Sequence, residues 1–145
     1  FQRATKGYSD YDRWSIDIYL AYLLPAMLLD MKENTVGYPA LAGLSSSEEW
    51  DKILEEMAEH FHNTLCWDES IPINKQIMEA YDKMDAHILT PEKVFSENCE
   101  YDDEEAYRQD QKIWLELENK GSQFREDEKN LACDMLKTWF FNLWD

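Results

Sequence analysis

The sequence has few of the residues on which most catalytic motifs and disulfide frameworks depend. Its 145 residues include four glycines and three cysteines, and it contains no glycine-rich phosphate loop and no GxSxG, HExxH or CxxC motif. A P-loop nucleotide hydrolase is excluded, because its phosphate cradle needs that glycine-rich loop. The cysteines, Cys66, Cys99 and Cys133, are odd in number and far apart, which favours free thiols in a reducing compartment over disulfides.

Positive charge is also scarce. Fourteen lysines and arginines stand against 31 acidic residues, which gives a formal net charge of −17 at pH 7. A field of this sign repels phosphate backbones, so nonspecific nucleic-acid binding is not expected. The charge favours solubility or a basic protein partner. A nucleic-acid mimic, whose carboxylates occupy a basic channel, is an alternative interpretation.

No apolar run is long enough for a membrane span, which needs about 20 residues. The longest such stretch, from Ile16 to Leu29, contains Asp17 as its only charge and is flanked by charged residues on both sides. No signal peptide is visible in the sequence, which begins at Phe1. We therefore expect no membrane partner and a cytoplasmic location.

The apolar content indicates a folded protein. Hydrophobic residues make up 44% of the chain, which is long enough to bury a full core, so we predict a single domain over residues 1–145. No alternation of apolar and polar residues typical of strands is present. The pattern predicts an all-α fold, a compact bundle of four to five helices around a central apolar N-terminal helix.

That N-terminal helix is predicted over residues 10–33. Ser9 and Asp12 have the spacing of a capping box at its start. Because its middle is apolar almost all the way round, we expect other helices to cover it on every side. Pro25 removes one backbone hydrogen bond and is expected to kink the helix.

Further helices are predicted along the rest of the chain. A capping box of Ser46 and Glu49 starts a helix that runs to residue 65, and Ser70 is expected to cap a helix over 73–88. A short helical turn is expected near Val94 and Phe95. Two more helices are predicted over residues 102–119, with Asp102 as the cap, and 122–143, with a break at Gly121.

Metal and catalytic sites find little support in the sequence. The best metal candidate is a group on the second helix, in which His62 and Cys66 share a face and Glu59 with His62 forms a single Glu-x-x-His pair. A di-iron site needs a second such pair. We therefore predict no catalytic residues, no metal and no cofactor, with a metal-dependent enzyme as an alternative. The members of this group are Glu56, Glu59, His60, His62 and Cys66.

The N-terminal segment is the one locally basic and aromatic part of the chain. Residues 1–14 carry a net charge of +1, so the remaining chain carries −18. Helix N-termini bind anions, and aromatic rings stack bases, so this segment is the candidate ligand site. The alternative is that its aromatic residues anchor the core and its cations are merely solvated. The candidate residues are Arg3, Lys6 and Arg13 for phosphates, and Tyr8, Tyr11 and Trp14 for bases.

Several phrases of the sequence resemble a known family. The segments GYSDYDRWSIDIYLAYLLPAMLLDMKE, GYPALAG followed by EEWDKILEEM, and WFFNLWD are similar to a family of small accessory proteins of tailed bacteriophages. The resemblance covers about half of the chain and leaves out residues 68–105. It implies a phage protein in the bacterial host cytoplasm that acts by binding, either inhibiting a host enzyme or sequestering a defence signal.

The leading hypothesis is a non-enzymatic phage protein that counters host defence by sequestering a small nucleotide signal, as a homo-oligomer whose termini pool their cations. The main alternative is an acidic inhibitor that binds a basic host protein. Its contacts would include Glu100, Asp102, Asp103 and Glu104. A scaffold protein that assembles through its aromatic C-terminus is a further alternative.

Overall fold

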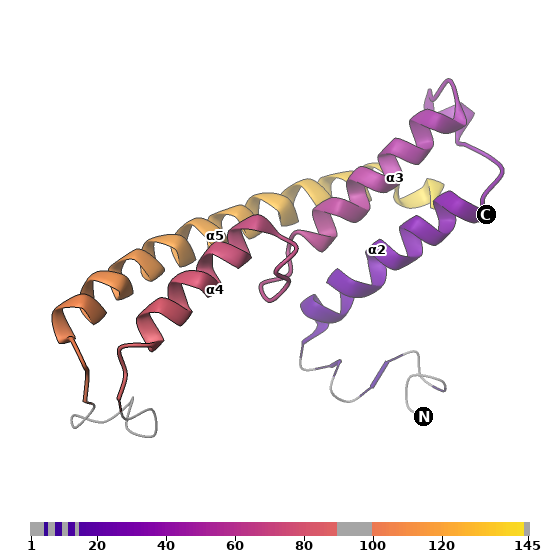
Figure 1. Cartoon of the computed structure of the whole chain (residues 1–145). Coiled ribbons are helices and arrows are strands. Elements are labelled where there is room, and N and C mark those ends of the chain that lie inside the picture. Colours follow the sequence, from indigo (N-terminus) through magenta and orange to yellow (C-terminus); the bar gives the residue numbers. More distant parts are fainter. Residues whose placement is uncertain (1–4, 6–7, 10–11, 14, 90–99, 144–145) are drawn as a thin grey trace. The chain divides into compact units, whose positions relative to one another are not determined.

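The computed structural model describes residues 5, 8, 9, 12, 13, 15–89 and 100–143, and its named elements are all helices (Figure 1). Extended pairing among these residues is limited to one isolated bridge between Ile88 and Tyr101. The predicted all-α class is therefore confirmed. In chain order the elements are α2 (Ile16–Asn34), the 3-10 helix η1 (Ala40–Ala42), α3 (Ser47–His62), α4 (Pro72–Asp85), α5 (Glu104–Trp139) and the 3-10 helix η3 (Phe140–Asn142).

The contacts within the chain gather into two compact units. Unit 1 consists of Phe1–Leu65 and Arg125–Asp145, and unit 2 consists of Cys66–Phe124. The helices α2 and α3 belong to unit 1, and α4 belongs to unit 2. The long helix α5 supplies residues to both units.

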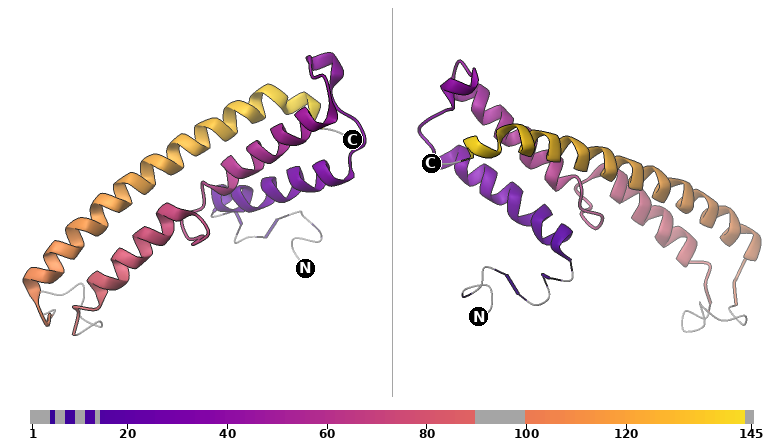
Figure 2. Two further views of the ribbon diagram at one scale, coloured as in Figure 1. Left: turned by 45° about the horizontal axis from the view of Figure 1, so that its top comes forward. Right: turned by 180° about the vertical axis from the view of Figure 1, so that it is seen from behind.

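The core of unit 1 lies among α2, α3 and the final part of α5, which run side by side (Figures 1 and 2). In α3 the apolar residues Trp50, Leu54, Met57 and Phe61 recur at the spacing of one helix face, and all four are buried. Trp50 of α3 and Trp139 of α5 meet edge to face, with ring centroids 5.4 Å apart. The buried cluster consists of Leu28, Trp50, Leu54, Met57, Ala58, Phe61 and Ala132.

The start of α3 follows from its capping residues, as the sequence predicts. Ser46 is the N-cap, and its hydroxyl oxygen accepts a hydrogen bond from the backbone nitrogen of Glu49 at 3.4 Å. The Glu49 carboxylate reaches back to the backbone nitrogen of Ser45 at 2.8 Å. Two backbone donors at this helix end therefore have partners, although the carboxylate reaches one residue further back than in an ordinary capping box.

Helix α2 begins later than predicted. The expected hydrogen bonds between Ser9 and Asp12 do form, at 2.7 and 3.2 Å, but they close a turn that precedes the helix. The helix itself starts at Ile16 and contains Pro25 in its interior. The prediction of a helix from residue 10 is therefore wrong, because capping-box geometry stabilises an isolated turn as well as a helix start. The structure does not confirm that this helix is central.

Unit 2 combines α4 with the first part of α5 (Figure 2). Helix α4 begins at Pro72, whose fixed φ suits the first helical position, and Ile71 is the N-cap without a side-chain hydrogen bond. The prediction that Ser70 caps this helix is wrong. Instead, the buried Asn74 donates from its side-chain amide to the carbonyl oxygen of Asp68 at 3.1 Å and ties the preceding turn to the helix.

Helix α5 is continuous over 36 residues, so the predicted break at Gly121 is wrong. One glycine costs a helix about 1 kcal/mol, and packing along a helix of this length offsets that cost. The predicted cap is wrong by one residue, because Asp103 accepts the hydrogen bond from the backbone nitrogen of Ala106 at 3.0 Å. The turn expected near Val94 and Phe95 lies outside the described residues.

Candidate functional site

One side of α2 packs in unit 1 and the other side is uncovered. Ala21 and Leu28 are its buried residues, and Leu24 and Met31 pack against the core from neighbouring turns of the same side. Tyr19 and Leu23 are half-buried, and six further large apolar side chains of the helix are 39 to 58% exposed. They are Ile16, Ile18, Leu20, Tyr22, Met27 and Leu29.

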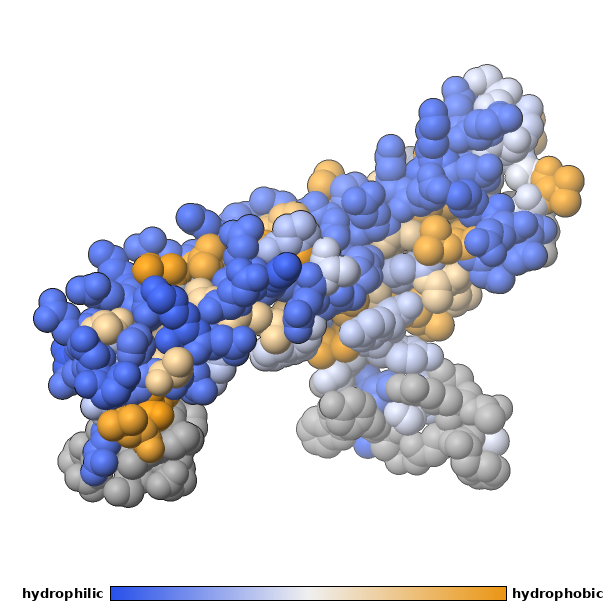
Figure 3. All heavy atoms as spheres, viewed as in Figure 1, coloured by the Kyte–Doolittle hydropathy of each residue, from blue (hydrophilic) through white to orange (hydrophobic). Residues whose placement is uncertain are grey.

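We call the side of α2 that carries Ile18, Tyr22, Ala26 and Leu29, beside the buried side with Ala21 and Leu28, its outer face. Ile18, Tyr22, Ala26 and Leu29 follow one another there at spacings of four, four and three residues, as helix geometry requires for one face. Hydrophilic residues cover most of the surface in Figure 3, and hydrophobic residues come to the surface along α2. Exposed apolar surface of this kind in an acidic protein usually marks an interface.

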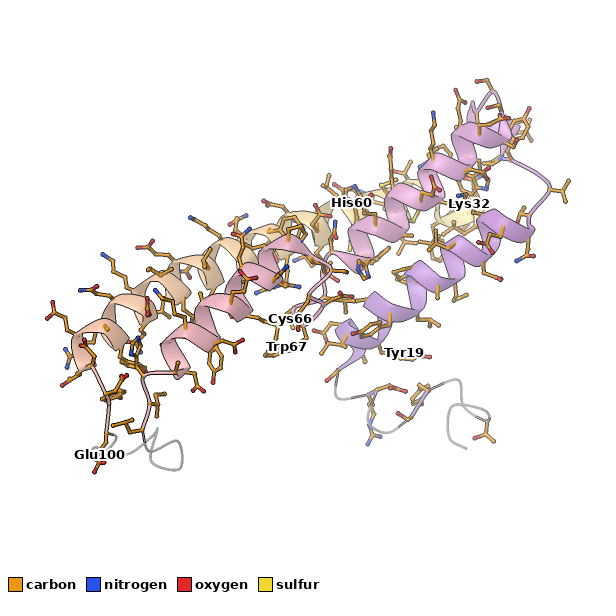
Figure 4. The ribbon with its side chains drawn as sticks, in the orientation of Figure 1. Tyr19, Lys32, His60, Cys66, Trp67 and Glu100 are labelled. Atoms are coloured by element: carbon orange, nitrogen blue, oxygen red, sulfur yellow. The ribbon has the colours of Figure 1, made fainter. Side chains whose placement is uncertain are left out.

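The outer face is hollowed near the start of the helix. A cavity of about 430 Å³ opens there, lined mainly by apolar and aromatic side chains. Two residues of the preceding turn, the buried Asp12 and the half-buried Ser15, supply its polar part. Figure 4 places Tyr19 at this end of α2. The lining residues are Asp12, Ser15, Ile18, Tyr19, Tyr22, Leu23 and Ala26.

Acidic groups lie at both ends of the outer face. Asp12 lines the cavity at one end, and Asp30 and Glu33 continue the face by one turn at the other. The cation of this part of the helix points elsewhere, because Lys32 pairs with Glu55 of α3 on the covered side (Figure 4). The Glu55 carboxylate raises the pKa of Lys32, so this lysine stays charged and engaged. The outer face is therefore apolar in the middle, with the exposed Asp30 and Glu33 at one end and the exposed Arg13 beside the buried Asp12 at the other.

The predicted ligand site falls only in part on described residues. Tyr8 and Arg13 are both exposed, and Arg13 follows Asp12 in the turn beside the cavity. The structure thus brings one predicted cation and the cavity into the same neighbourhood. The other predicted ligand residues, Arg3, Lys6, Tyr11 and Trp14, lie outside the described residues.

The aromatic C-terminal segment divides between core and surface. Trp139 and Leu143 pack against the unit 1 core, whereas Phe140 and Phe141 are exposed and meet edge to face at 5.4 Å. A second hollow of about 320 Å³ is lined by Asn142, by Trp50 and by the loop after α2.

In unit 2 a histidine is held between two carboxylates. The Nδ1 atom of His87 lies 2.9 Å from an oxygen of Asp102, and its Nε2 atom lies 3.2 Å from an oxygen of Asp110. Lys83 of α4 donates to the other oxygen of Asp110 at 2.8 Å. We call these four residues the histidine clasp. Both ring nitrogens can donate only in the imidazolium form, so the geometry favours charged His87.

The pKa values in the clasp shift as this geometry requires. The hydrogen bond to Asp102, followed by that to Asp110, raises the pKa of His87 above its ordinary value despite some desolvation. His87 in turn lowers the pKa of Asp102, and Lys83 together with His87 lowers that of Asp110. The clasp ties the end of α4 to the start of α5, which is a structural role.

The acidic run predicted to contact a basic protein is largely engaged in local contacts. Asp102 belongs to the histidine clasp, Asp103 caps α5, and Glu104 pairs with Arg108 at 2.6 Å. Glu100 is exposed (Figure 4). These contacts order the start of α5, so most of this run is engaged within the chain.

The candidate metal residues on α3 do not converge. His60 instead pairs with Glu128 of α5 at 2.8 Å, and Asn63 donates to the same carboxylate at 2.9 Å. Across the described part of the chain, no three histidine, cysteine, aspartate or glutamate side chains are grouped so as to hold a metal ion. Cys66 and Cys133 are free thiols, and Cys99 is outside that part.

Within the described ranges, no helix has the length and apolar character needed to cross a membrane. Comparisons of the chain with protein-family models, with curated proteins and with solved structures find no match. The candidate site therefore depends on its own geometry.

Sequence reasoning missed the outer face as a site, although its signal was present. A helix that is apolar all round needs cover on every side, and the sequence analysis assigned that cover to helices of the same chain. Among the residues that the structure describes, the buried positions of this helix, Ala21 and Leu28, lie on one side. The same pattern is therefore consistent with a helix that reserves one side for a partner.

Proposed function

We propose that the protein is a non-enzymatic helical binding protein that holds a protein partner on the outer face of α2. The observation that carries the proposal is the row of exposed apolar side chains Ile18, Tyr22 and Leu29 on a helix whose other side is packed. Burial of apolar surface is the main favourable term in association, so such a row favours a partner.

The resemblance to phage accessory proteins extends this proposal to its setting. In that setting the protein acts in the cytoplasm of a bacterial host and counters host defence by inhibiting or sequestering its partner. A homo-oligomer, if formed, would use the second apolar surface around Phe140 and Phe141, which leaves the outer face of α2 accessible.

A small nucleotide is the second candidate ligand, and one observation favours it. The cavity of about 430 Å³ is in the size range of small-molecule sites, and it offers the rings of Tyr19 and Tyr22 with Arg13 in the adjoining turn. Against a phosphate-bearing ligand stands the carboxylate of Asp12 in the lining. For this reason we rank the protein partner first.

The test compares the immobilised protein with two variants in a bacterial lysate. Leu29→Glu places a charge on the outer face, and Leu115→Glu makes the same change at a similarly exposed leucine of α5 in unit 2. We expect a protein that the unmodified chain and Leu115→Glu both capture and that Leu29→Glu loses. Circular dichroism of both variants checks that their helices are retained.

Two outcomes would change the conclusion. Capture of the same proteins by all three baits would show that the outer face is not the binding surface. A nucleotide released on denaturation of the purified protein, together with no Leu29-dependent protein partner, would favour the second candidate. Its binding should then weaken in Arg13→Ala and Lys6→Ala.

A further inference from the structure

The second hollow is lined by residues that carry no charge. It has a volume of about 320 Å³, and all of its lining residues belong to unit 1. They come from the end of α2 and the loop that follows it, from Trp50 of α3 and from Asn142 of η3. A hollow without a charged side chain offers no ion pair to a charged ligand, so it suits an uncharged one.

Trp50 supplies a hydrogen-bond donor that the chain itself does not use. The side chain is 2% exposed, and its ring meets that of Trp139 edge to face at 5.4 Å, which holds the indole in the core of unit 1. Within the described chain its Nε1–H group has no acceptor. No side-chain nitrogen of that part of the chain is both sealed from solvent and unpartnered, so this N–H reaches the surface. The second hollow is the opening that Trp50 lines, so an acceptor bound there can meet the N–H.

Three further polar side chains line the hollow. Neither the Asn142 amide nor the Tyr38 hydroxyl makes a hydrogen bond to another described residue. Asn34 differs, because its amide nitrogen donates to the backbone and side-chain oxygens of Asp30 at 2.9 and 3.0 Å. Its carbonyl oxygen remains as an acceptor. The hollow therefore combines aromatic rings with both donors and acceptors.

These groups match the base of a nucleoside. A carboxamide such as that of Asn142 can donate and accept at once along the edge of a nucleobase, as asparagine does with adenine. The ring of Tyr38 is 40% exposed and offers a face on which a base can stack. A phosphate group fits poorly, because no lining residue is a cation and the carboxylate of Asp30 adjoins the hollow through Asn34.

We propose that the second hollow binds the base of an uncharged nucleoside. The Trp50 Nε1–H donates to a ring acceptor, Asn142 contacts the edge of the base, and Tyr38 stacks on its face. Because the core of unit 1 already holds the indole of Trp50, binding orders few additional groups. This site is separate from the outer face of α2 and does not depend on a protein partner there.

The indole N–H of Trp50 gives a direct measurement of binding. In the proton–nitrogen correlation spectrum of the labelled full chain, each tryptophan gives one indole signal, and Trp50→Phe identifies the signal of Trp50. The probes are adenosine, guanosine, cytidine and uridine, each titrated to about 5 mM. We expect at least one nucleoside to shift this signal saturably. Its monophosphate should bind at least about fivefold more weakly, because the phosphate meets no cation and an adjoining carboxylate.

A matched pair of asparagine variants locates the site. Asn142→Ala removes the amide that contacts the base, so it should weaken binding by about three- to tenfold. Asn119→Ala removes the amide of an exposed asparagine of α5 in unit 2 and should change binding less than about twofold. Trp50→Phe serves only to identify the signal. If it does not fold, sequential assignment of the unmodified chain identifies the signal instead.

Three results would overturn the proposal. The first is an unchanged Trp50 signal with all four nucleosides at about 5 mM. The second is an equal effect of Asn142→Ala and Asn119→Ala. The third is a monophosphate that binds as tightly as its nucleoside, because the absence of charge in the hollow would then play no part in recognition.

Discussion

Gly43 is a residue whose backbone conformation decides what may replace it. It follows η1 with a φ of +94°, and its backbone nitrogen donates to the carbonyl oxygen of Ala40 at 3.1 Å. Among the described residues, no non-glycine residue has a positive φ. A side chain disfavours this region because its Cβ approaches the backbone too closely. The loop between α2 and α3 therefore needs glycine at this position.

Replacement of Gly43 by alanine should lower the free energy of unfolding by about 1 kcal/mol, because alanine is strained at this φ. Gly37→Ala in the same loop is the matched control. An added Cβ meets no heavy atom within 4 Å at either glycine, and only Gly43 has a positive φ. Urea unfolding should show destabilisation for Gly43→Ala alone. Equal effects of the two substitutions would contradict this explanation.

At the scale of the helices, the histidine clasp makes the stability of the junction between α4 and α5 depend on pH. The pKa of His87 is raised from 6.5, so its contribution to stability is complete below pH 6.5 and is lost as the pH rises through the raised value. The pKa values of Asp102 and Asp110 are lowered from 3.8, so their contribution is complete above pH 3.8 and is lost at lower pH. The clasp is therefore fully formed between these two values.

A double-mutant cycle over His87→Gln and Asp102→Asn tests this dependence. The coupling between the two residues should be present near pH 5 and should decline above pH 7 as the imidazolium loses its proton. Thermal unfolding across this pH range provides the measurement. A coupling that does not change with pH would show that neutral hydrogen bonds alone hold the clasp.

The helices of unit 1 could largely be predicted from the sequence, and their ends show where prediction fails. The stripe of α3 has one strong period, and the Ser46 capping box marks its start, so sequence and structure agree there. The Ser9 and Asp12 capping box led to a wrong helix start, because a turn that precedes the helix makes the same hydrogen bonds. At Gly121 a local preference for a break was weaker than the packing of a long helix.

The candidate site was harder to predict for a different physical reason. Hydrophobic periodicity shows which residues of α2 avoid water, but it does not show whether the same chain or another one covers them. Only the contacts of Leu28 and the exposure of Leu29 separate the two sides. Likewise, no spacing rule connects His87 with Asp110, because they meet through the pairing of two helices.

For the whole molecule, the division into two units predicts how a core mutation spreads. Leu54 is fully buried in unit 1, so Leu54→Ala should lower the stability by about 2 to 5 kcal/mol through the cavity that it leaves. Because the contacts gather within each unit, hydrogen exchange should accelerate most in α2, in α3 and in the part of α5 from Arg125 onward.

Met84→Ala, in a buried position of α4, is the reciprocal variant for unit 2. In this variant, amide hydrogen exchange should accelerate most within residues 66–89 and 100–124. If both variants accelerate exchange evenly along the whole described chain, the two units unfold as one, and the continuous helix α5 couples them completely.

Unit 1 combines two segments that are far apart in the sequence, Phe1–Leu65 and Arg125–Asp145, and this affects folding during synthesis. At about 5 to 20 residues per second, a ribosome needs roughly 4 to 16 s to synthesise residues 66–145 after Leu65 has been added. During that interval Trp50 and Leu54 lack their packing partners Trp139 and Ala132, because α5 has not yet been synthesised to cover the apolar side of α3. The nascent chain therefore exposes this apolar side until residues 125–143 emerge, and a premature stop codon after unit 2 would leave the core of unit 1 incomplete.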